Sequence, residues 1–429
     1  MSLTRTRLAV GVAFVALVAA SQASASAFYL QEQSVRGTGR AYSGEVADKG
    51  VGSLWWNPAS IAGIARSEAY IGANMILVNA KTTNSGSTIT RPVPVTTTVG
   101  GTDTALDPIN DGLVPNLGGA WKINDKLSLG LSVAAPYNFT TEYQADSWSR
   151  YDALKSQLRT VNVDGVVAYR INEMLDLGFG VTAMYADAEL TNALPNISPL
   201  QADGLQSLKG DGWAYGYTVG AQFHPSQSLT IGASYRSKID HKLDGAVKVS
   251  GLLAPIPTAS NFAVDGQAKI TLPWMLNLGA RWAVNDHWTL NGSVSRVGWS
   301  EFDAIRVTYT GGSSISAQDY KNVTTYAAGV DYQASPRLTL RAGVQYDPTP
   351  TPEVGRTARV PDGDRMMYAT GATWAATENL KLDAALSYIA FEKSQINRTD
   401  VTATSSTVRL RGEVEGSAVV LSTGARFSF

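Results

Sequence analysis

The fold is decided by the stretch Leu338-Thr339-Leu340-Arg341-Ala342-Gly343-Val344-Gln345-Tyr346, in which apolar residues alternate strictly with polar or small ones. Successive side chains of a β-strand point to opposite faces of its sheet, so this pattern gives a strand with one apolar and one polar face. A short turn of small and polar residues, Ala334-Ser335-Pro336-Arg337, stands directly before it. Turn formers followed by alternation with period two predict a β-hairpin.

The same arrangement recurs along the chain. Each copy is a short run with Asn, Asp, Pro or Ser that leads into alternation beginning at an apolar residue, and the copies lie roughly 45–60 residues apart. The other copies are Ile123-Asn124-Asp125-Lys126-Leu127, Ile171-Asn172-Glu173-Met174-Leu175, His224-Pro225-Ser226-Gln227-Ser228-Leu229, Val284-Asn285-Asp286-His287-Trp288 and Ala376-Thr377-Glu378-Asn379-Leu380. This spacing fits one long hairpin plus its loop, so the sequence predicts an all-β protein.

Composition narrows the class of protein. The chain has 429 residues, of which 17% are charged and 44% hydrophobic, and its mean hydropathy is -0.07. Beyond residue 25, no apolar run approaches the roughly 18 residues that a membrane helix needs. A net charge of -1 argues against a nucleic-acid partner, and the lack of cysteine excludes disulfides, thiolate metal sites and cysteine nucleophiles. The chain is therefore a large soluble all-β protein or a membrane β-barrel.

The N-terminus favours the membrane alternative. Arg5 and Arg7 precede an apolar stretch from Leu8 to Ala20, and Ala23-Ser24-Ala25 is a small-residue cleavage site of the A-x-A type. These features predict a secretory signal peptide over residues 1–25. The protein is thus expected to be exported, and to reside in the cell outer membrane.

Fourteen strands can be placed, and bacterial outer-membrane barrels have an even number. They are expected near residues 68–80, 116–123, 127–143, 157–171, 174–190, 209–224, 228–249, 266–284, 287–310, 321–334, 337–347, 366–376, 380–393 and 413–429. The repeated short turns would join them on one side and longer loops on the other. The last strand ends at Phe429, which resembles the terminal signal of outer-membrane proteins. The sequence therefore predicts a 14-stranded antiparallel transmembrane β-barrel over residues 67–429.

Residues 26–66 do not fit this barrel pattern. They lack alternation and are rich in Gly and small residues, as in Gly37-Thr38-Gly39-Arg40-Ala41-Tyr42-Ser43-Gly44. Irregular backbone at membrane depth is tolerated only inside protein or water-filled space. The barrel lumen supplies that space, so residues 26–66 are expected to plug it as an N-terminal hatch.

Several motifs together resemble one family. Phe28 with Gln31 and Glu32, the run 37–44 and Asn57-Pro58-Ala59 look like the hatch of FadL-type outer-membrane transporters of long-chain fatty acids and other hydrophobic compounds. Further similar pieces follow in order: Tyr137-Asn138-Phe139-Thr140-Thr141-Glu142-Tyr143, Tyr235-Arg236-Ser237, Pro255-Ile256-Pro257-Thr258-Ala259, Trp299-Ser300-Glu301-Phe302 and Val360-Pro361-Asp362-Gly363-Asp364-Arg365. The resemblance implies a fourteen-stranded barrel with a hatch that takes up hydrophobic compounds passively.

The resemblance also implies where such a compound would bind first. Apolar outer loops would form a capture groove, since large exposed apolar patches usually bind something; the alternative is that these residues merely pack together. The candidates are Leu194, Ile197, Leu200, Leu252, Leu253, Ile256 and Pro257. Phe28 matches a Phe that sits in the family's ligand pocket, where movement of the N-terminus links binding to release. The alternative role of Phe28 is to anchor the N-terminal segment.

The exit is expected at an inward kink of the third strand, where family members open sideways. The matching residues are Pro136, Tyr137 and Asn138. Pro cannot donate a ladder hydrogen bond and marks an edge or a bulge, which fits a kink. Asn138 occupies a position where the family pattern has Gly, and backbone groups freed there must find lumen water or the hatch.

The sequence leaves the substrate open. Some fatty-acid transporters of the family place an Arg and a Lys near the bound carboxylate, and the matching positions here are Asn192 and Ser316. This departure favours an uncharged substrate, such as an aromatic hydrocarbon, over a fatty acid. A polar-solute porin and a non-transporting adhesin or phage receptor are further alternatives.

No enzymatic activity is expected. The sequence has no G-x-S-x-G, H-E-x-x-H or P-loop motif, and His224, His241 and His287 lack ligand spacing. No catalytic residue, cofactor or metal ion is predicted. The expected partners are a hydrophobic small molecule, outer-membrane lipid and lipopolysaccharide, and the barrel assembly machinery, and the protein is expected to be a monomer.

Overall fold

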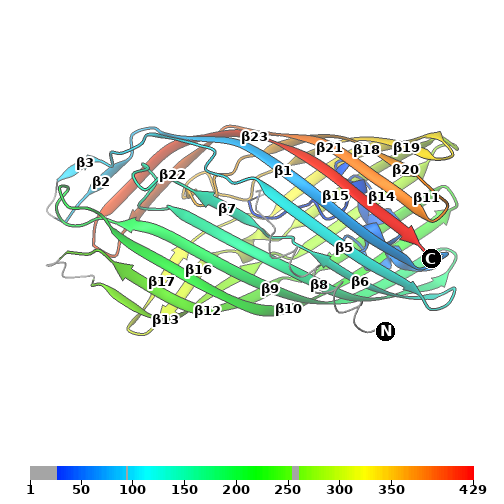
Figure 1. Ribbon diagram of the computed structural model, residues 1–429, viewed down its shortest axis with the longest axis horizontal. Helices are drawn as coiled ribbons and strands as arrows, with labels where there is room; N and C mark the ends of the chain where they lie inside the picture. The colour runs from blue at the N-terminus through cyan, green and yellow to red at the C-terminus, as the bar shows by residue number, and fades with distance from the viewer. Residues whose placement is uncertain (1–26, 93–94, 254–259) are drawn as a thin grey trace.

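The computed structural model describes residues 27–92, 95–253 and 260–429, which form a closed antiparallel β-barrel of fourteen strands (Figure 1). Ten strands are continuous: β1 (Glu68–Asn84), β5 (Gly112–Lys122), β8 (Lys155–Asn172), β9 (Leu175–Leu194), β10 (Gly204–Ser226), β18 (Val323–Ser335), β19 (Leu338–Asp347), β20 (Arg365–Ala375), β21 (Leu380–Phe391) and β23 (Thr407–Ser428). Four consist of two pieces: β6 (Leu127–Ala134) with β7 (Phe139–Glu142), β11 (Leu229–Arg236) with β12 (Ile239–Ser250), β14 (Met275–Ala283) with β13 (Phe262–Leu272), and β15 (Trp288–Val297) with β16 (Ala304–Tyr309).

The barrel closes between the first and last strands. β1 pairs with β23 from Glu68 opposite Ser428 to Asn84 opposite Gly412, and with β5 on its other side. Shorter strands extend the long connections: β2 (Thr88–Thr90), β3 (Thr96–Thr98), β4 (Thr104–Leu106), β17 (Gly312–Ala317) and β22 (Ser394–Val401). The predicted 14-stranded antiparallel barrel is confirmed. The expected signal peptide, residues 1–25, lies outside the described residues.

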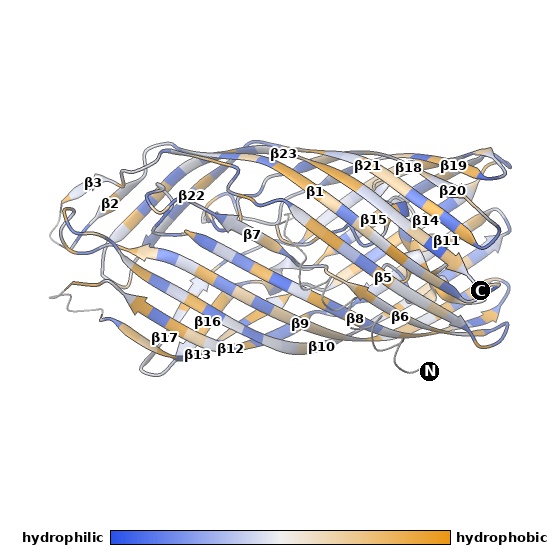
Figure 2. Ribbon diagram, viewed as in Figure 1, coloured by the Kyte–Doolittle hydropathy of each residue, from blue (hydrophilic) through white to orange (hydrophobic). Residues whose placement is uncertain are grey.

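The strands place their apolar side chains on the outside of the barrel, as expected for a barrel in a membrane. On β19, the apolar Leu340 is 42% exposed, whereas the neighbouring Arg341 is only 8% exposed. Apolar side chains on the outside and polar side chains on the inside reverse the arrangement of a soluble sandwich. Figure 2 shows the resulting alternation of hydrophobic and hydrophilic residues along the strands.

The two ends of the barrel differ, as predicted. The six short turns join β5 to β6, β8 to β9, β10 to β11, β14 to β15, β18 to β19 and β20 to β21. They lie at the end where the C-terminus lies, and the long connections gather at the opposite end (Figure 1). Several strands continue beyond their predicted ends into the long-loop side, among them β1, β10 and β23. The third strand is interrupted over residues 135–138, which include the expected kink residues, and the strands expected at 228–249, 266–284 and 287–310 are each divided into two pieces.

Residues 27–66, called here the N-terminal segment, lie in the barrel interior near the end with the short turns (Figure 1). The segment contains the short helix α2 (Val35–Thr38) and three 3-10 turns, η1 (Glu45–Ala47), η2 (Val51–Ser53) and η3 (Pro58–Ile61). A fourth 3-10 turn, η4 (Trp299–Glu301), follows β15. No helix in the described part of the chain is long and apolar enough to cross a membrane. Most side chains of the segment are buried, including polar ones such as Ser34, Arg40 and Asn57.

Glycines in the wall let the segment approach the strands closely. A Cβ atom on Gly343 would lie 2.1 Å from the carbonyl oxygen of Arg40, and one on Gly232 would lie 2.2 Å from that of Val46. No side chain fits at such distances, so these strand positions need glycine. The inner surface of the wall is thus shaped to the backbone of the segment.

A buried group of charges fixes the middle of the segment to the wall. Arg40 pairs with Glu45 and Asp48 within the segment, and its Nη1 lies 3.3 Å from Oδ2 of Asp331 on β18. Arg281 on β14 reaches the same Asp331 oxygen at 2.9 Å. Removing one partner from such a cluster would leave charges buried without compensation, so the cluster holds this part of the segment in one place.

Candidate ligand site and wall interruption

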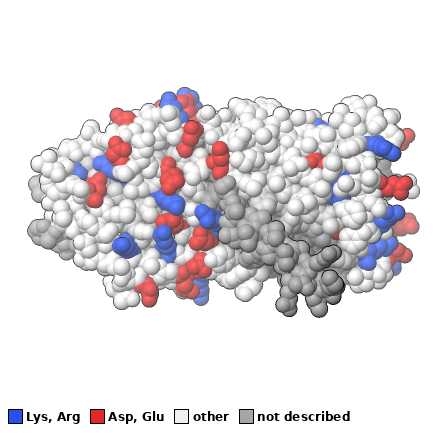
Figure 3. Space-filling model, in the orientation of Figure 1, with Lys and Arg blue, Asp and Glu red and all other residues white. Residues whose placement is uncertain are grey.

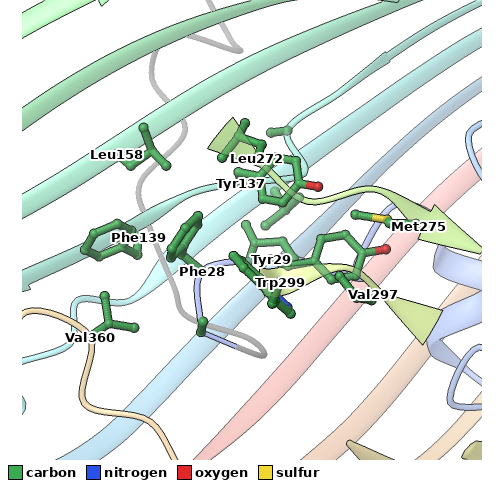
Figure 4. Packing of buried hydrophobic residues seen from close by; sticks show 14 of the residues in the cluster. Phe28, Tyr29, Tyr137, Phe139, Leu158, Leu272, Met275, Val297, Trp299 and Val360 are labelled. Atoms are coloured by element: carbon green, nitrogen blue, oxygen red, sulfur yellow. The ribbon is translucent and has the colours of Figure 1, made fainter. Parts of the chain in front are cut away.

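Phe28 stands at the centre of an aromatic cluster (Figure 4). Its ring is 1% exposed, and its centroid lies 4.8 Å from that of Trp299, 5.1 Å from that of Phe302 and 5.5 Å from that of Phe139. The contacts with Trp299 and Phe302 are edge-to-face, the arrangement that aromatic quadrupoles favour. Phe28 therefore fits a pocket lined by residues from several distant parts of the chain.

An apolar cavity adjoins this cluster on the side of the long loops. Its lining is mostly aliphatic and aromatic. It comes from the N-terminal segment, from strands β7, β8, β9, β10, β12, β13 and β16, from the residue after η4 and from the loop after β19: Phe28, Phe139, Leu158, Ala188, Leu190, Leu208, Leu243, Val247, Ile270, Phe302, Ile305, Val307 and Val360. Gly210 and Gly266 also line it, and both lie opposite Gly245 across β12 in the strand register. Because these positions carry no side chain, the wall leaves room for a ligand there.

The guanidinium of Arg359 stands at the rim of the apolar cavity. Arg359, in the loop between β19 and β20, lines both this cavity and a larger, more polar vestibule towards the long loops. Its guanidinium donates to Oγ of Ser156 at 3.1 Å and to Oδ1 of Asn192 at 3.2 Å, and Asp152 is 3.9 Å away. Burial lowers the pKa of Arg359, but a guanidinium remains charged at neutral pH.

Arginines contact both positions at which this sequence lacks the charged residues of some family members. Asn192 and Ser316, the neutral residues at the family's charged positions, each accept a hydrogen bond from an arginine: Asn192 from Arg359, and Ser316 from Arg398 at 3.4 Å. Arg398 lies on β22, lines the vestibule and pairs with Asp400. Positive charge is therefore present at this place, supplied from other parts of the chain.

The candidate residues of the outer loops lie in different environments. Leu194 and Leu252 are buried together with Val249 and Phe262, and Leu194 lines the vestibule. Ile197 is half-buried, Leu253 is exposed, and Leu200 is 95% exposed. Ile256 and Pro257 lie outside the described residues. A capture groove formed by these loops therefore remains a prediction.

The interruption of the third strand contains the predicted kink residues Pro136, Tyr137 and Asn138. β5 pairs with β6 only as far as Leu117 opposite Val133, and the next contact between the two strands is the bridge from Ile109 to Thr141. We call the unpaired interval, residues 112–116 on one side and 135–138 on the other, the pairing gap. The third strand stays attached to β8 there, because Oδ1 of Asn138 accepts from the Thr160 amide at 2.6 Å.

The N-terminal segment fills the pairing gap from inside. The Leu30 amide donates to the carbonyl of Pro136 at 2.8 Å, and Tyr29 forms a β-bridge with Tyr137. On the other side, the Glu32 carbonyl accepts from Asn74 on β1 at 2.8 Å and from Asn116 on β5 at 3.0 Å. Residues 28–33 thus reach from the aromatic cluster to both edges of the pairing gap.

The predicted hatch motif has a structural role in the segment. Oδ1 of Asn57 accepts from the Ala59 amide at 2.9 Å and so caps η3, whose first residue is Pro58. Its Nδ2 donates to the carbonyls of Val46 at 2.7 Å and of Ala221 on β10 at 3.1 Å. Asn57 therefore joins two parts of the segment to the wall.

Some residues of the site were not predicted from the sequence. Trp299, Phe302 and Val360 belong to the pieces that carry the resemblance, but their position around Phe28 follows only from the fold. Arg359 and Gln33 had no assigned role. A signal was available for Arg359, because it is a charged residue directly beside the apolar Val360.

The closed barrel, the segment in its lumen and the apolar cavity define an outer-membrane transport protein for hydrophobic compounds. The chain belongs to the family described as outer membrane protein transport protein (OMPP1/FadL/TodX), which it matches over residues 16–429. The protein is accordingly an outer-membrane protein of a family described by transport.

The proteins similar to this chain in sequence or in structure include transporters of two kinds of compound. The chain is 28% identical to a long-chain fatty acid transport protein of Escherichia coli O6:H1, over 99% of this chain and 98% of that protein. It is similar in structure to a FadL homologue of Pseudomonas aeruginosa, with a TM-score of 0.83 and 24% identity, over 94% of this chain and 99% of that one. The toluene transporter TbuX of Ralstonia pickettii gives a TM-score of 0.65 with 17% identity, over 92% and 98% of the two chains.

Proposed function

We propose that this protein takes up long-chain fatty acids passively across the outer membrane, by capture at the outer loops, transfer to the cavity beside Phe28, and release through the wall at the pairing gap. The observation that carries the proposal is the reach of residues 28–33. Phe28 lines the cavity, and Leu30 and Glu32 hold the two edges of the pairing gap. A ligand that displaces Phe28 would therefore also pull on the segment that closes the gap.

Capture is supported by the apolar character of the outer loops. Exposed Leu200 and Leu253 offer apolar surface at the mouth, and Leu194 lines the vestibule that leads inwards. Burial of a methylene group is worth about 0.8 kcal/mol, so even a shallow groove concentrates a long acyl chain from water. Leu208 and Val247 line both the vestibule and the cavity, which gives an apolar path between them.

The substrate class follows from Arg359. The cavity suits an acyl chain, and the guanidinium at its rim can donate two hydrogen bonds to a carboxylate in a bidentate pair. Arg359 has only one carboxylate, Asp152, at 3.9 Å among the described residues. A fatty acid satisfies both the apolar lining and this charge, whereas a hydrocarbon satisfies only the lining.

Release into the membrane avoids water. The strands on both sides of the gap face lipid, so a hydrophobic compound that leaves there does not enter the aqueous periplasm. Opening requires the hydrogen bonds of Leu30 and Glu32 to break, while the ion pairs of Arg40 hold the middle of the segment in place. Only the first few residues of the hatch would move.

Uptake of uncharged aromatic hydrocarbons by the same route is the second candidate function, and the binding of oleate and of methyl oleate to the unaltered protein and to Arg359→Met separates the two. A polar-solute porin would need an open lumen, whereas residues 27–66 fill it here. A non-transporting adhesin or phage receptor would tolerate a locked hatch without any loss.

The proposal is tested by a disulfide between the hatch and the third strand. The chain has no cysteine, so Tyr29→Cys with Tyr137→Cys introduces a single pair at positions that form a β-bridge. Facing residues in such a bridge lie about 4.5–5.5 Å apart, within disulfide range. Oleate uptake by cells that display the oxidised variant should fall to background, and reduction should restore it.

A control pair locks the part of the segment that is expected to stay fixed. Val51→Cys with Gly118→Cys suits this purpose, because a Cβ atom on Gly118 meets mainly the side chain of Val51. Oxidation of this pair should leave uptake unchanged. Normal uptake by the oxidised Tyr29/Tyr137 pair, at equal surface amounts, would overturn release through the pairing gap.

A further inference from the structure

Three cations stand side by side on the outside of the barrel, in a group called here the basic row. Lys242 on β12 lies directly opposite Lys269 on β13, and Lys269 lies directly opposite Arg306 on β16. All three side chains are exposed and point away from the lumen. Like charges that face each other across strands are destabilising. An anion bound beside the row would therefore stabilise it.

The carboxylates near the row, in the part of the chain that the structure describes, form no ion pair with its two lysines. Among the described residues, neither Lys242 nor Lys269 has a carboxylate within 4.0 Å, and only Arg306 is paired, with Asp303 at 2.5 Å. Asp240 and Asp244 flank Lys242 along β12, but they accept hydrogen bonds at 2.7 Å from Thr271 and Gln267 respectively. On the opposite side of the barrel the pattern differs, because Lys81 and Lys393 both pair with Glu415.

The height of the basic row on the barrel indicates its surroundings. Towards the short-turn end, the outer surface of these strands carries the aromatic residues Tyr217, Tyr235 and Trp274, whose rings contact one another. Rings of aromatic residues mark the edges of the apolar band of a membrane barrel. Figure 3 shows charged side chains gathered over the half of the barrel with the long loops, beyond a zone almost free of charge. The row therefore lies beyond the apolar band, on the side of the outer leaflet's head groups.

A polar groove lies immediately beyond the basic row. It is lined by Asp244, Asp265, Gln267, Thr308 and Tyr309 over the glycines Gly245 and Gly266. The register places Asp244, Gln267 and Thr308 opposite one another, two residues along the strands from Lys242, Lys269 and Arg306. Carboxylate, amide and hydroxyl groups over a glycine floor suit the hydroxyls of a sugar.

We propose that the basic row and this groove bind a phosphorylated sugar head group, that of the lipid A part of lipopolysaccharide in the outer leaflet. The row would pair with a phosphate, and the groove would hold the sugar that carries it. The inference rests on the outer-membrane location and not on the transport proposal. It places an ordered lipid beside the wall of the cavity, since Gly266 and Gln267 line both the groove outside and the cavity inside.

The test compares lipid binding by the purified full-length barrel and by a variant with Lys242→Gln and Lys269→Gln. Because a basic residue near a charged membrane surface contributes about 1 kcal/mol, affinity for bis-phosphorylated lipid A should fall about thirtyfold for the pair. Native mass spectrometry of the barrel with added lipid measures this. The control variant, Lys81→Gln with Lys393→Gln, should bind lipid A as the unaltered protein does. Heat-modifiable migration in gel electrophoresis checks that each variant is folded.

Three further ligands separate the sources of the phosphate. Lipid A without phosphates should bind about as weakly to the unaltered protein as lipid A does to the variant. Phosphatidylglycerol and inorganic phosphate should both bind more weakly than lipid A, because neither offers the sugar. Equal affinity of the variant and the unaltered protein for lipid A would overturn the proposal, and equal binding of phosphatidylglycerol would remove the role of the groove.

Discussion

The side-chain amide of Gln33 forms hydrogen bonds with both the amide and the carbonyl of Ala135. Oε1 of Gln33 accepts from the Ala135 amide at 3.3 Å, and its Nε2 donates to the Ala135 carbonyl at 3.3 Å. Ala135 is the first residue after β6. The Gln33 side chain makes the two hydrogen bonds there that a neighbouring strand would otherwise make. The closed wall at the pairing gap depends on this side chain as well as on backbone bonds.

Replacement of Gln33 should therefore loosen the third strand. Gln33→Ala removes the partner of the Ala135 amide, while the Ala135 carbonyl keeps the hydrogen bond from Nδ2 of Asn138 at 3.3 Å. The variant should favour the open arrangement about fivefold, since a net hydrogen bond contributes about 1 kcal/mol. Amide hydrogen exchange over residues 134–139 should become faster to the same degree. The control Gln31→Ala removes a side chain that instead contacts Asp347 and Gln345, and should leave this exchange unchanged. Equal protection of the peptide in Gln33→Ala would show that the amide does not hold the gap.

Phe28 should determine ligand binding. Phe28→Ala removes a ring that contributes roughly 1.5–3 kcal/mol of apolar burial, so oleate should bind at least about tenfold more weakly and uptake should fall. Fluorescence of Trp299, whose ring lies 4.8 Å away, reports the binding. Tyr215→Ala, which removes an exposed ring on β10, serves as the control. Unchanged affinity together with easier proteolysis of the segment would assign Phe28 the anchoring role instead.

Arg359 should discriminate by charge. Arg359→Met should weaken the binding of oleate about 10–100-fold, because a hydrogen bond to a charged group is worth about 1.5–3 kcal/mol, and should leave methyl oleate unaffected. Isothermal titration with both ligands measures the difference. Arg159→Met, at an exposed position on the outside of β8, is the matched control. If oleate and methyl oleate bind the unaltered protein equally, the substrate is an uncharged compound and the hydrocarbon alternative gains support.

The ion pairs of Arg40 should keep the lumen closed. Arg40→Met leaves Glu45, Asp48 and Asp331 buried without this partner, a change that costs about 3–5 kcal/mol. The segment should become sensitive to protease, and the barrel should conduct ions in a planar bilayer where the unaltered protein is nearly silent. Lys49→Met, which removes a neighbouring charge of the segment that lies outside this cluster, should change neither measurement. A silent Arg40→Met barrel would show that the segment is held by its packing alone.

Much of the barrel could be predicted from the sequence because lipid outside and polar groups inside impose period two on every strand. The alternation of residues 338–346 is visible in β19, and the six short turns mark one end of the barrel. Strand lengths were predicted less well, since the parts of β1, β10 and β23 beyond the membrane lose the apolar face that makes alternation recognisable.

The site could be predicted only in part. Pro136 marked the break in the third strand because proline cannot join the ladder, but Gln33, which fills the break, is 102 residues away from Ala135 and belongs to no periodic pattern. Asn192 and Ser316 carry no charge at their own positions, and from this the sequence favoured an uncharged substrate. An alignment along the chain could not show that Arg359 and Arg398 enter the same space from other loops.

The shaping of the wall around the segment has a consequence for biogenesis. η3 contacts β8, β9 and β10, η1 contacts β11 and β14, and α2 contacts β20 and β21, so the segment meets strands from most of the circumference. A finished cylinder offers no passage for a coil that carries a buried Arg40 and fits against Gly232 and Gly343. The segment must therefore be in position before β1 and β23 pair and close the barrel. Residues 27–66 then act as the core around which the last strand pair of the barrel closes.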